Sequence, residues 1–294
     1  MRKKVIRSAA IAILVLLCAY FGISSYMASA LTNLDRIPIT ENPSSFGLNY
    51  EAISFPSRAD GLALKGWYIR GGEEQSAIIM VHGAEGNRAS GSKLDLARDL
   101  VAKGYNVLMF DLRGHGESEG AHLSAGYYER RDLLGAVDYL KNRGAESIGV
   151  LGFSLGAAIA ILTAAEEPDI SALVSDSSFA DLAEITNREA KERSGLPGWF
   201  TPGFILMNRV MYGVNLEAVK PVDAVTKIAP RPVFFIHGAA DDFVPVAHVY
   251  RLYEASHNPS NLLWVVPEAK HVESYNVAPL QYVEKVIAFL DKAL

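Results

Sequence analysis

A glycine-flanked serine is the most reactive group that the sequence offers. Ser154 stands in a G-x-S-x-G motif at residues 152–156, between an apolar run at residues 148–151 and a stretch of strong helix formers at residues 157–165. A strand, this motif and a helix in that order form a nucleophile elbow, in which a sharp turn exposes the serine hydroxyl. Side chains in place of the two glycines would collide in so tight a turn. We therefore expect Ser154 to be a nucleophile for acyl transfer.

The partners that a nucleophilic serine requires are found downstream of it. A serine hydroxyl needs a base to take its proton, and the base needs a carboxylate to fix its tautomer. His271 is the expected base, because it lies on a loop between the last apolar strand and the C-terminal helix. Asp241 is the expected acid, on the loop after the strand that ends at residue 236. Asp176, at the end of the preceding strand, is the alternative acid.

Other ionisable residues in this half of the chain fit these roles less well. His237 sits at a strand end, and His248 and His257 lie on or after a helix. Asp242 is the neighbour of Asp241, but we expect it to face solvent. None of these four side chains is therefore expected to take part in proton transfer with the serine.

Backbone amides near Ser154 are expected to stabilise the oxyanion of a tetrahedral intermediate. Leu155, directly after the serine, supplies one N–H group, and Ala84, in the turn after the apolar run at residues 77–81, is the expected source of the second. Glu85 is unexpected beside such a site, because its carboxylate would repel the negative charge. It must point outward or bind a cationic group of the substrate.

Motifs for other chemistries are incomplete in this sequence. The glycines within residues 114–120 resemble a dinucleotide-binding loop, but the last glycine comes one residue late and no clear helix follows it. The sequence contains no G-x-x-x-x-G-K-[ST] phosphate loop and no H-E-x-x-H zinc motif. We therefore expect neither a cofactor nor a metal. Asp111 and Arg113 are instead expected to tie loops together beside the site.

Apolar runs alternate with helical segments along most of the chain. The expected strands span residues 50–55, 62–69, 77–81, 106–110, 148–151, 172–175, 233–236 and 262–266. The expected helices span residues 90–103, 127–143, 157–165, 246–256 and 279–293. The first two strands form an antiparallel pair, and the remaining pattern predicts a mostly parallel sheet covered by helices on both faces. Since sites in such sheets lie beyond the carboxyl ends of the strands, the motifs should meet at one edge.

Residues 180–219 interrupt this alternation and are too long for a single crossover. The segment is rich in large apolar side chains, which favours a small helical lid over the site. We expect Trp199, Phe200, Phe204 and Met207 to line a pocket for the substrate. The alternative is that these helices simply pack on the body of the domain.

The N-terminus combines a basic and an apolar segment. Four basic residues within the first seven precede an uncharged stretch at residues 8–34. This stretch is long enough to span a bilayer, and the charges favour a cytoplasmic N-terminus. We expect a single-pass membrane anchor at residues 1–31, with the rest of the chain outside the cytoplasm. The alternative is a signal peptide that is cleaved near Ala30, because residues 28–30 form a small-x-small site.

Composition limits the partners of the protein. The net charge is −5 despite the basic N-terminus, so the body is acidic and no nucleic-acid partner is expected. The single cysteine, Cys18, lies in the apolar stretch, which leaves no internal disulfide. A polar linker with two prolines is expected at residues 32–45, followed by one domain at residues 46–294.

These motifs together resemble those of the α/β-hydrolase family. The matching residues, in family order, are His82-Gly83, residues 111–118, residues 152–156, residues 237–241 with Val244-Pro245, and His271. The subgroup that they resemble most comprises bacterial membrane-anchored hydrolases similar to serine aminopeptidases and monoacylglycerol lipases. The resemblance implies an α/β-hydrolase fold, a triad of Ser154, His271 and Asp241, and no cofactor. Lys270 departs from the glycine that relatives often carry before the histidine.

The expected function is hydrolysis of a carboxylic ester, or a related acyl bond, in a small-molecule substrate through an acyl-enzyme intermediate. A peptidase that removes N-terminal residues is the alternative among enzymes, with Glu85 or Glu184 to bind the substrate amine. A non-catalytic surface binding module on a hydrolase scaffold is the alternative from a different class. Because the same fold hosts many chemistries, the resemblance implies neither the acyl group nor the oligomeric state.

Overall fold

The computed structural model describes residues 2–33, 35–72, 75–194 and 197–294. The strands are β1 (Glu51–Pro56), β2 (Ala63–Ile69), β3 (Ser76–Val81), β4 (Asn106–Phe110), β5 (Ser147–Phe153), β6 (Ile170–Asp176), β7 (Val233–Gly238) and β8 (Leu262–Val266). They form one eight-stranded sheet in the order β1-β2-β4-β3-β5-β6-β7-β8. β2 is antiparallel to both of its neighbours, and all the other pairs are parallel. The mostly parallel sheet predicted from the sequence is thereby confirmed.

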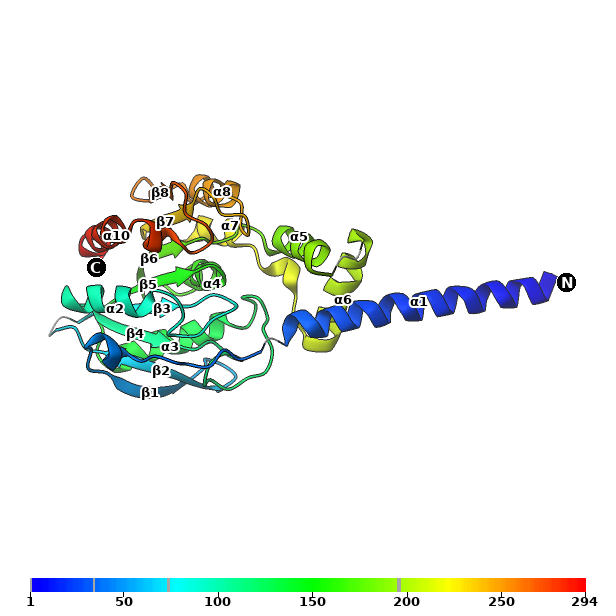
Figure 1. Ribbon diagram of the computed structural model, residues 1–294, viewed down its shortest axis with the longest axis horizontal. Coiled ribbons are helices and arrows are strands. Elements are labelled where there is room, and N and C mark those ends of the chain that lie inside the picture. Colours follow the sequence, from blue (N-terminus) through cyan, green and yellow to red (C-terminus); the bar gives the residue numbers. More distant parts are fainter. Residues whose placement is uncertain (1, 34, 73–74, 195–196) are drawn as a thin grey trace.

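Helices cover both faces of this sheet. The helices are α1 (Arg2–Thr32), α2 (Lys93–Ala102), α3 (Arg130–Asn142), α4 (Leu155–Ala164), α5 (Leu182–Ser194), α6 (Thr201–Tyr212), α7 (Pro221–Ala224), α8 (Ala247–Ser256), α9 (Ser274–Val277) and α10 (Pro279–Ala293). Four 3-10 turns are η1 (Pro43–Phe46), η2 (Gly198–Phe200), η3 (Leu216–Ala218) and η4 (Val225–Lys227). α2 and α10 pack on one face, and α3, α4 and α8 pack on the other (Figure 1).

Alternate residues of each central strand enter two separate cores. In β3, Ile79 and Val81 belong to the core under α3 and α4, while Ile78 and Met80 belong to the core under α2 and α10. All four side chains are buried. Burial on both faces explains why the central strands read as continuous apolar runs rather than as an alternating pattern.

One predicted helix begins later than the sequence indicated. α3 begins at Arg130 rather than at residue 127. The carboxylate of Glu129 accepts hydrogen bonds from the amides of Ser124 and Gly126, both at 2.7 Å. These bonds hold residues 124–129 in a turn, which the amphipathic pattern of the segment does not reveal.

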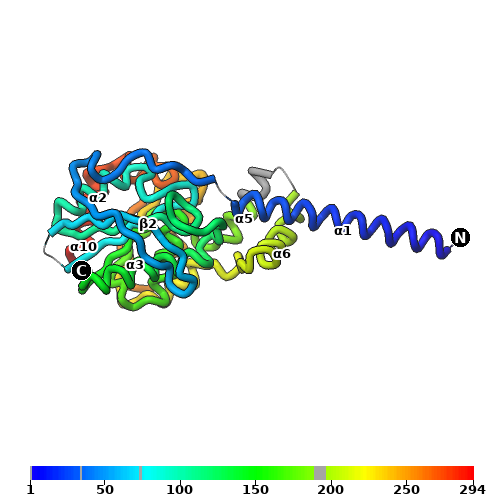
Figure 2. The backbone as a smooth tube through the Cα atoms, turned by 90° about the horizontal axis from the view of Figure 1, so that it is seen from below, coloured from blue at the N-terminus to red at the C-terminus, as the bar shows by residue number. Residues whose placement is uncertain are grey.

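The segment between β6 and β7 contains α5, η2, α6 and η3. α6 runs beside the last part of α1, and the first part of α1 projects away from the rest of the molecule (Figures 1 and 2). Residues 2–19 of α1 are exposed, whereas Ser24, Met27 and Ala28 are buried against the domain. α1 is long and apolar enough to cross a membrane.

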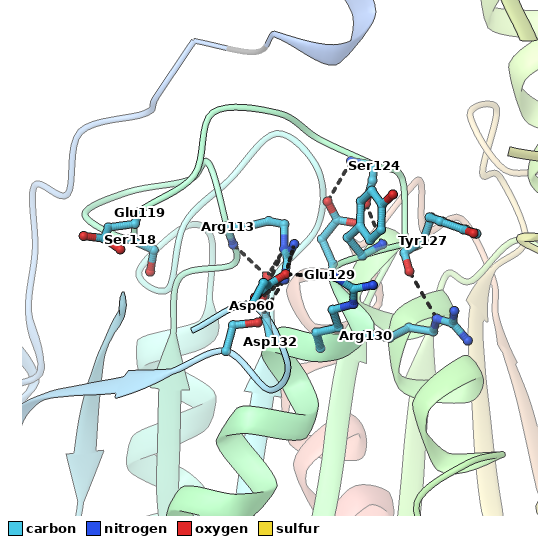
Figure 3. Close-up of polar contacts among 12 residues, drawn as sticks. Asp60, Arg113, Ser118, Glu119, Ser124, Tyr127, Glu129, Arg130 and Asp132 are labelled. Carbon is cyan, nitrogen blue, oxygen red and sulfur yellow. Dashed lines mark hydrogen bonds and ion pairs between the residues drawn. The ribbon is translucent and has the colours of Figure 1, made fainter. Parts of the chain in front are cut away.

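The loop after β4 is held by buried ion pairs. Arg113 donates to Asp132 (Nη2 to Oδ1, 2.6 Å) and to Asp60 (Nη1 to Oδ2, 2.9 Å), as Figure 3 shows. It thereby joins this loop to α3 and to the β1–β2 turn. Asp111 accepts a hydrogen bond from the amide of Arg88 at 2.8 Å. Both Asp111 and Arg113 therefore tie loops together, as the sequence predicted.

Replacing Arg113 with alanine should strongly destabilise the fold, because it leaves the fully buried carboxylate of Asp132 without its cation. We expect the free energy of unfolding to fall by about 3–5 kcal/mol. Urea unfolding of the full chain in detergent micelles measures this loss. Arg98→Ala, which removes an exposed ion pair with Asp95, is the control and should cost at most about 1 kcal/mol. Equal losses for the two variants would contradict the role given to Arg113.

Candidate active site

Ser154 stands at the turn between β5 and α4. Its backbone has φ 53° and ψ −119°, which L-residues rarely adopt because the conformation costs about 1–3 kcal/mol. Its amide donates to the carbonyl oxygen of Asp176 at 2.8 Å, which ties the turn to the end of β6. The strained turn is the one that the G-x-S-x-G motif predicts, and it places the hydroxyl at the N-terminus of α4.

The two glycines of the motif allow three backbone segments to meet. A Cβ atom on Gly152 would lie 2.5 Å from the carbonyl oxygen of Gly156. A Cβ atom on Gly156 would lie 2.2 Å from the carbonyl oxygen of Val81 and 2.5 Å from that of His82. No side chain fits at either position, so the start of α4 can pack directly against the end of β3.

His271 links the serine to a carboxylate. Its Nε2 lies 2.7 Å from Ser154 Oγ, and its Nδ1 lies 2.7 Å from Asp241 Oδ2. The histidine belongs to the loop between β8 and α9, where Val272 has a positive φ of 58°. Lys270 is exposed on this loop. The departure from glycine at Lys270 is therefore compatible with contact between His271 and the serine.

The Asp241 carboxylate is buried and receives several hydrogen bonds. Its Oδ1 accepts from the amides of Phe243 (3.0 Å) and Val244 (2.7 Å), while His237 Nε2 lies 3.3 Å from its Oδ2. Burial alone raises the pKa of Asp241, but hydrogen bonds from His237 and His271 outweigh it and hold the pKa well below its usual range. The group is therefore a carboxylate at neutral pH, and it favours a proton on Nδ1 of His271.

Asp176, the alternative acid, has other partners. Its carboxylate accepts hydrogen bonds from the hydroxyls of Ser177 (2.9 Å) and Tyr282 (2.9 Å). The side chain is fully enclosed, and burial raises its pKa. The geometry thus places Asp241, and not Asp176, at hydrogen-bonding distance from His271 Nδ1.

Two of the other downstream histidines have structural partners, and the third ends a helix. His248 Nδ1 accepts from the amide of Ala180 at 3.2 Å, which holds the start of the lid segment. His257 ends α8 in the left-handed conformation, with φ 44°. His237 contacts Asp241 and donates to the carbonyl oxygen of Val244 at 2.7 Å, so it supports the carboxylate. The position of His237 at a strand end was visible in the sequence, but its contact with Asp241 was not.

The two amides expected to bind the oxyanion belong to backbone segments beside Ser154. Leu155 supplies the first N–H group of α4, which has no acceptor within the helix. A Cβ atom on Gly83 would lie 3.3 Å from Ser154 Cβ, so the turn that carries Ala84 lies beside the serine. His115 Nε2 is 2.6 Å from the carbonyl oxygen of Ala84 and fixes this turn. His115 is a supporting residue that the sequence analysis did not identify.

His82 braces the same turn from inside the protein. Its Nε2 accepts from the amide of Leu112 at 3.0 Å, and its Nδ1 donates to the carbonyl oxygen of Gly83 at 2.7 Å. Burial lowers the pKa of His82 well below its usual value. A neutral ring with its proton on Nδ1 satisfies both contacts, so His82 is a structural residue rather than a proton carrier.

A cavity of about 160 Å³ adjoins these groups. Ala84 and Glu85 line one side of it, and Phe243 lines another. The ring centroid of Phe243 is 4.8 Å from that of His271. The remaining walls come from the end of α1, the loop before α3, α5, α6 and η3. The cavity therefore lies between the turn that carries Ala84, the Phe243 ring beside His271, and the lid segment.

The four predicted pocket residues occupy different places. Phe204 lines the cavity. Trp199 and Phe200 stack instead on Tyr20 of α1, with ring centroids 5.7 Å and 5.2 Å away. Met207 is half-buried and packs on the core below α6. Phe204 is thus the member of the four that lines the cavity, whereas Phe200 and the largely exposed Trp199 lie against α1, a contact that the sequence did not indicate.

The two acids considered for binding an amine also differ. Glu85 lines the cavity. Glu184 pairs with Arg251 of α8 at 2.7 Å, and this hydrogen bond lowers the pKa of Glu184.

Among the residues that the structure describes, no three His, Cys, Asp or Glu side chains gather as a metal site requires.

Comparison with known proteins supports one family. Residues 72–227 match the family model Hydrolase_4, described as serine aminopeptidase, S33. The Bacillus subtilis protein YqkD is 33% identical over 246 residues, covering 82% of this chain and 79% of YqkD. The α/β hydrolase domain-containing protein WAV2 of Arabidopsis thaliana is 30% identical over 263 residues, covering 87% of this chain and 82% of WAV2.

A solved structure agrees with these sequence matches. The esterase Pf2001 of Pyrococcus furiosus superposes with a TM-score of 0.76 and is 30% identical, over 90% of this chain and 98% of the esterase chain. The eight-stranded sheet, with its serine at the β5–α4 turn, is thus an α/β-hydrolase fold. By sequence and by structure, the chain belongs to the α/β-hydrolase family.

Proposed function

We propose that this protein is a serine hydrolase that cleaves a carboxylic ester or a related acyl bond. One observation carries the proposal, namely that His271 lies 2.7 Å from both the Ser154 hydroxyl and the Asp241 carboxylate. A histidine held between a hydroxyl and an ionised carboxylate can remove the hydroxyl proton as the oxygen attacks a carbonyl carbon. The neighbouring cavity provides a place for the acyl group.

The reaction proceeds in two steps through an acyl-enzyme. His271 Nε2 takes the proton of Ser154 as the oxygen attacks, and Asp241 stabilises the resulting imidazolium. The amides of Leu155 and Ala84 donate to the oxyanion. The imidazolium then gives its proton to the leaving alcohol. A water molecule, deprotonated by the same ring, attacks the acyl-enzyme and releases the acid and the free serine.

An ester substrate is favoured by the apolar wall of the cavity and by one relative. Phe204, Phe243 and Leu123 line the cavity and suit an aliphatic or aromatic acyl group. The Pyrococcus furiosus protein Pf2001, which is 30% identical, is called an esterase. These two observations support a small-molecule ester as the substrate.

A peptidase is a second candidate because an acid lines the cavity. Glu85 lies next to Ala84, where its carboxylate would receive the amine of an N-terminal residue. The description of the matched family as serine aminopeptidase agrees with this reading. Glu184, the other acid considered, does not line this cavity and pairs with Arg251 at 2.7 Å.

We propose that α1 holds the protein in the cell membrane as a single span. Basic residues cluster at its start and its apolar part is exposed, which favours a cytoplasmic N-terminus and a hydrolase domain on the other side. The chain after α1 is tied to the domain, since Asn87 Nδ2 donates to the carbonyl oxygen of Ile37 at 3.1 Å. The hydrolase domain would therefore lie close to the membrane surface on the side away from the cytoplasm.

Removal of the nucleophile tests the proposal directly. Ser154→Ala should lower turnover of an active ester by roughly 10⁴–10⁶-fold, because the acyl-enzyme cannot form. A fluorophosphonate probe should label the wild type and fail to label this variant. Ser45→Ala, at an exposed serine of η1, is the control and should keep both signals. A wild type that resists the probe would favour a binding module without catalysis.

The identity of the acid can be tested with two matched substitutions. Asp241→Asn should lower turnover by roughly 10⁴-fold, because the amide no longer holds the imidazole in the required tautomer. Asp176→Asn should cost less than about tenfold, because Asp176 contacts Ser177 and Tyr282 rather than the histidine. Initial rates on one ester decide between them. The reverse order of the two effects would assign the acid to Asp176.

The class of bond that is cleaved can be identified by comparing ester and arylamide substrates for the wild type and for a Glu85 variant. We expect the wild type to hydrolyse p-nitrophenyl esters much faster than aminoacyl-arylamides. Glu85→Gln should leave the preference for esters in place. If the protein is a peptidase instead, Glu85→Gln should lower kcat/KM for the arylamides by about tenfold or more, because a charge-assisted contact with the amine is lost.

A further inference from the structure

The last turns of α1 are built into the hydrolase domain. Ser24 and Ala28 are fully buried against the domain. Gly203 of α6 approaches α1 so closely that a Cβ atom there would lie 2.3 Å from Ser24 Oγ and 2.8 Å from the Tyr20 ring. Small residues permit this close approach of two helices. Thr32 Oγ1 also donates to Asn208 Oδ1 at 3.0 Å, so the two helices run in the same direction.

The end of α1 also forms part of the cavity wall. Leu31 and Thr32 line the cavity together with Ala84 and with Phe243, whose ring lies beside His271. The carbonyl oxygen of Thr32 accepts from the amide of Leu123, another lining residue, at 2.9 Å. A cut after Ala30 would detach the helix from this wall and would place a charged amino terminus at Leu31.

A second contact connects the segment after α1 to the oxyanion turn. Arg36 donates to four backbone carbonyls between residues 115 and 120, at 2.7–3.2 Å. His115 in that loop contacts the carbonyl oxygen of Ala84. The end of α1 is therefore bonded to the lining residue Leu123, and the segment after it is bonded to the loop that supports Ala84.

The free part of α1 requires an apolar surrounding. Residues 2–19 are exposed, and nearly all those after Arg7 are apolar. An exposed apolar surface of this length is unstable in water. Counted from Arg7 at 1.5 Å per residue, a hydrocarbon layer of about 30 Å ends near Met27. Leu31 lies about 6 Å further along the helix, which is within the headgroup region.

The lid segment carries exposed apolar side chains beside α1. Trp199 lies beside Tyr20, whose hydroxyl donates to its carbonyl oxygen at 3.1 Å, and 61% of Trp199 remains exposed. Leu206 of α6 is 46% exposed. On the same count, Tyr26 lies at the edge of the hydrocarbon layer, where exposed Tyr residues are typical, while Trp199, beside Tyr20, lies about 10 Å inside it. The exposed apolar surface of α1 thus continues onto η2 and α6, which lie side by side with it (Figures 1 and 2).

We propose that α1 remains in the mature protein as a wall of the acyl pocket, and that α1, η2 and α6 together seat this pocket on the bilayer. The substrate is then a long-chain acyl ester dissolved in the membrane. The ester bonds of such lipids lie in the headgroup region, at the level where Leu31 and Thr32 line the cavity. This inference rests on the proposed ester hydrolysis at Ser154 and extends it to a substrate class.

Two substitutions in α1, one at the cavity wall and one on the exposed part of the helix, test whether α1 shapes the acyl pocket. The full chain is reconstituted in vesicles of phosphatidylethanolamine and phosphatidylglycerol, and kcat/KM is measured for p-nitrophenyl dodecanoate and for p-nitrophenyl acetate. Leu31→Trp narrows the cavity and should lower the dodecanoate-to-acetate ratio by about tenfold or more. Leu17→Trp, on the exposed part of the same helix, should keep the wild-type ratio. An unchanged ratio for Leu31→Trp would overturn the role of α1.

The bilayer contact is tested at a surface that does not line the cavity. Leu206→Asp adds a charge to the lipid-facing side of α6 and should lower the same ratio by about fivefold or more, because the pocket is lifted from the lipid. Leu280→Asp, at an exposed leucine of α10, is the control and should keep the ratio. If Leu206→Asp and Leu280→Asp gave the same dodecanoate-to-acetate ratio, the proposed contact of the pocket with the bilayer would be wrong, even if Leu31→Trp acts as expected.

Two further results separate this inference from the proposed function. N-terminal sequencing of the membrane-bound protein should find a mature N-terminus that precedes Ala28. A mature N-terminus at Leu31 would overturn this inference and leave the proposed ester hydrolysis untouched. A wild type that is labelled by a fluorophosphonate and cleaves acetate, but prefers acetate over dodecanoate, would also overturn only the inference. A wild type that cleaves neither ester and resists the probe would overturn both.

Discussion

Close contact between the β5–α4 turn and the end of β3 sets the geometry of the site. Gly156 has no side chain, and a Cβ atom there would lie 2.2 Å from the carbonyl oxygen of Val81. This contact brings the turn that carries Ala84 next to Ser154. One backbone approach therefore positions the proposed nucleophile and both proposed oxyanion donors. The strained φ of 53° at Ser154 is tolerated because the surrounding sheet and helix hold the turn from both sides.

The proposed partners of the serine lie on loops that follow strands on the other side of β5 from β3. β6, β7 and β8 lie in that order beside β5, so the loops after β7 and β8 bring Asp241 and His271 to the same edge. The loop after β6 lies between them and supports both ends of the site. The carbonyl oxygen of Asp176 accepts from the Ser154 amide, and Ser177 Oγ accepts from the Val272 amide at 3.2 Å. The order of parallel strands thus assembles groups that are far apart in the sequence.

Most strands could be predicted from the sequence, because strands buried on both faces are apolar. Ser154 and His271 could also be predicted as the proposed reacting groups, because each lies on a turn or loop after such a strand. The sequence favoured Asp241 as the acid but left Asp176 as an alternative, since both follow strands and only the fold brings Tyr282 onto Asp176. The pocket wall was harder still. The aromatic residues of the lid segment suggested a pocket lining, but nothing in the sequence indicates that Trp199 and Phe200 stack on the N-terminal helix, whose own pattern indicates only a membrane span.

An anchor that is also a pocket wall limits how the domain can move. A catalytic domain on a long flexible tether would sample many orientations relative to the bilayer. Here Thr32 is bonded to Asn208, and Arg36, four residues later, is already bonded to the loop that supports Ala84. So short a connection leaves little freedom for the domain to rotate about α1. If α1 spans the membrane, the orientation of the cavity toward the lipid is therefore set by these hydrogen bonds and by the packing of α6, not by diffusion of the domain.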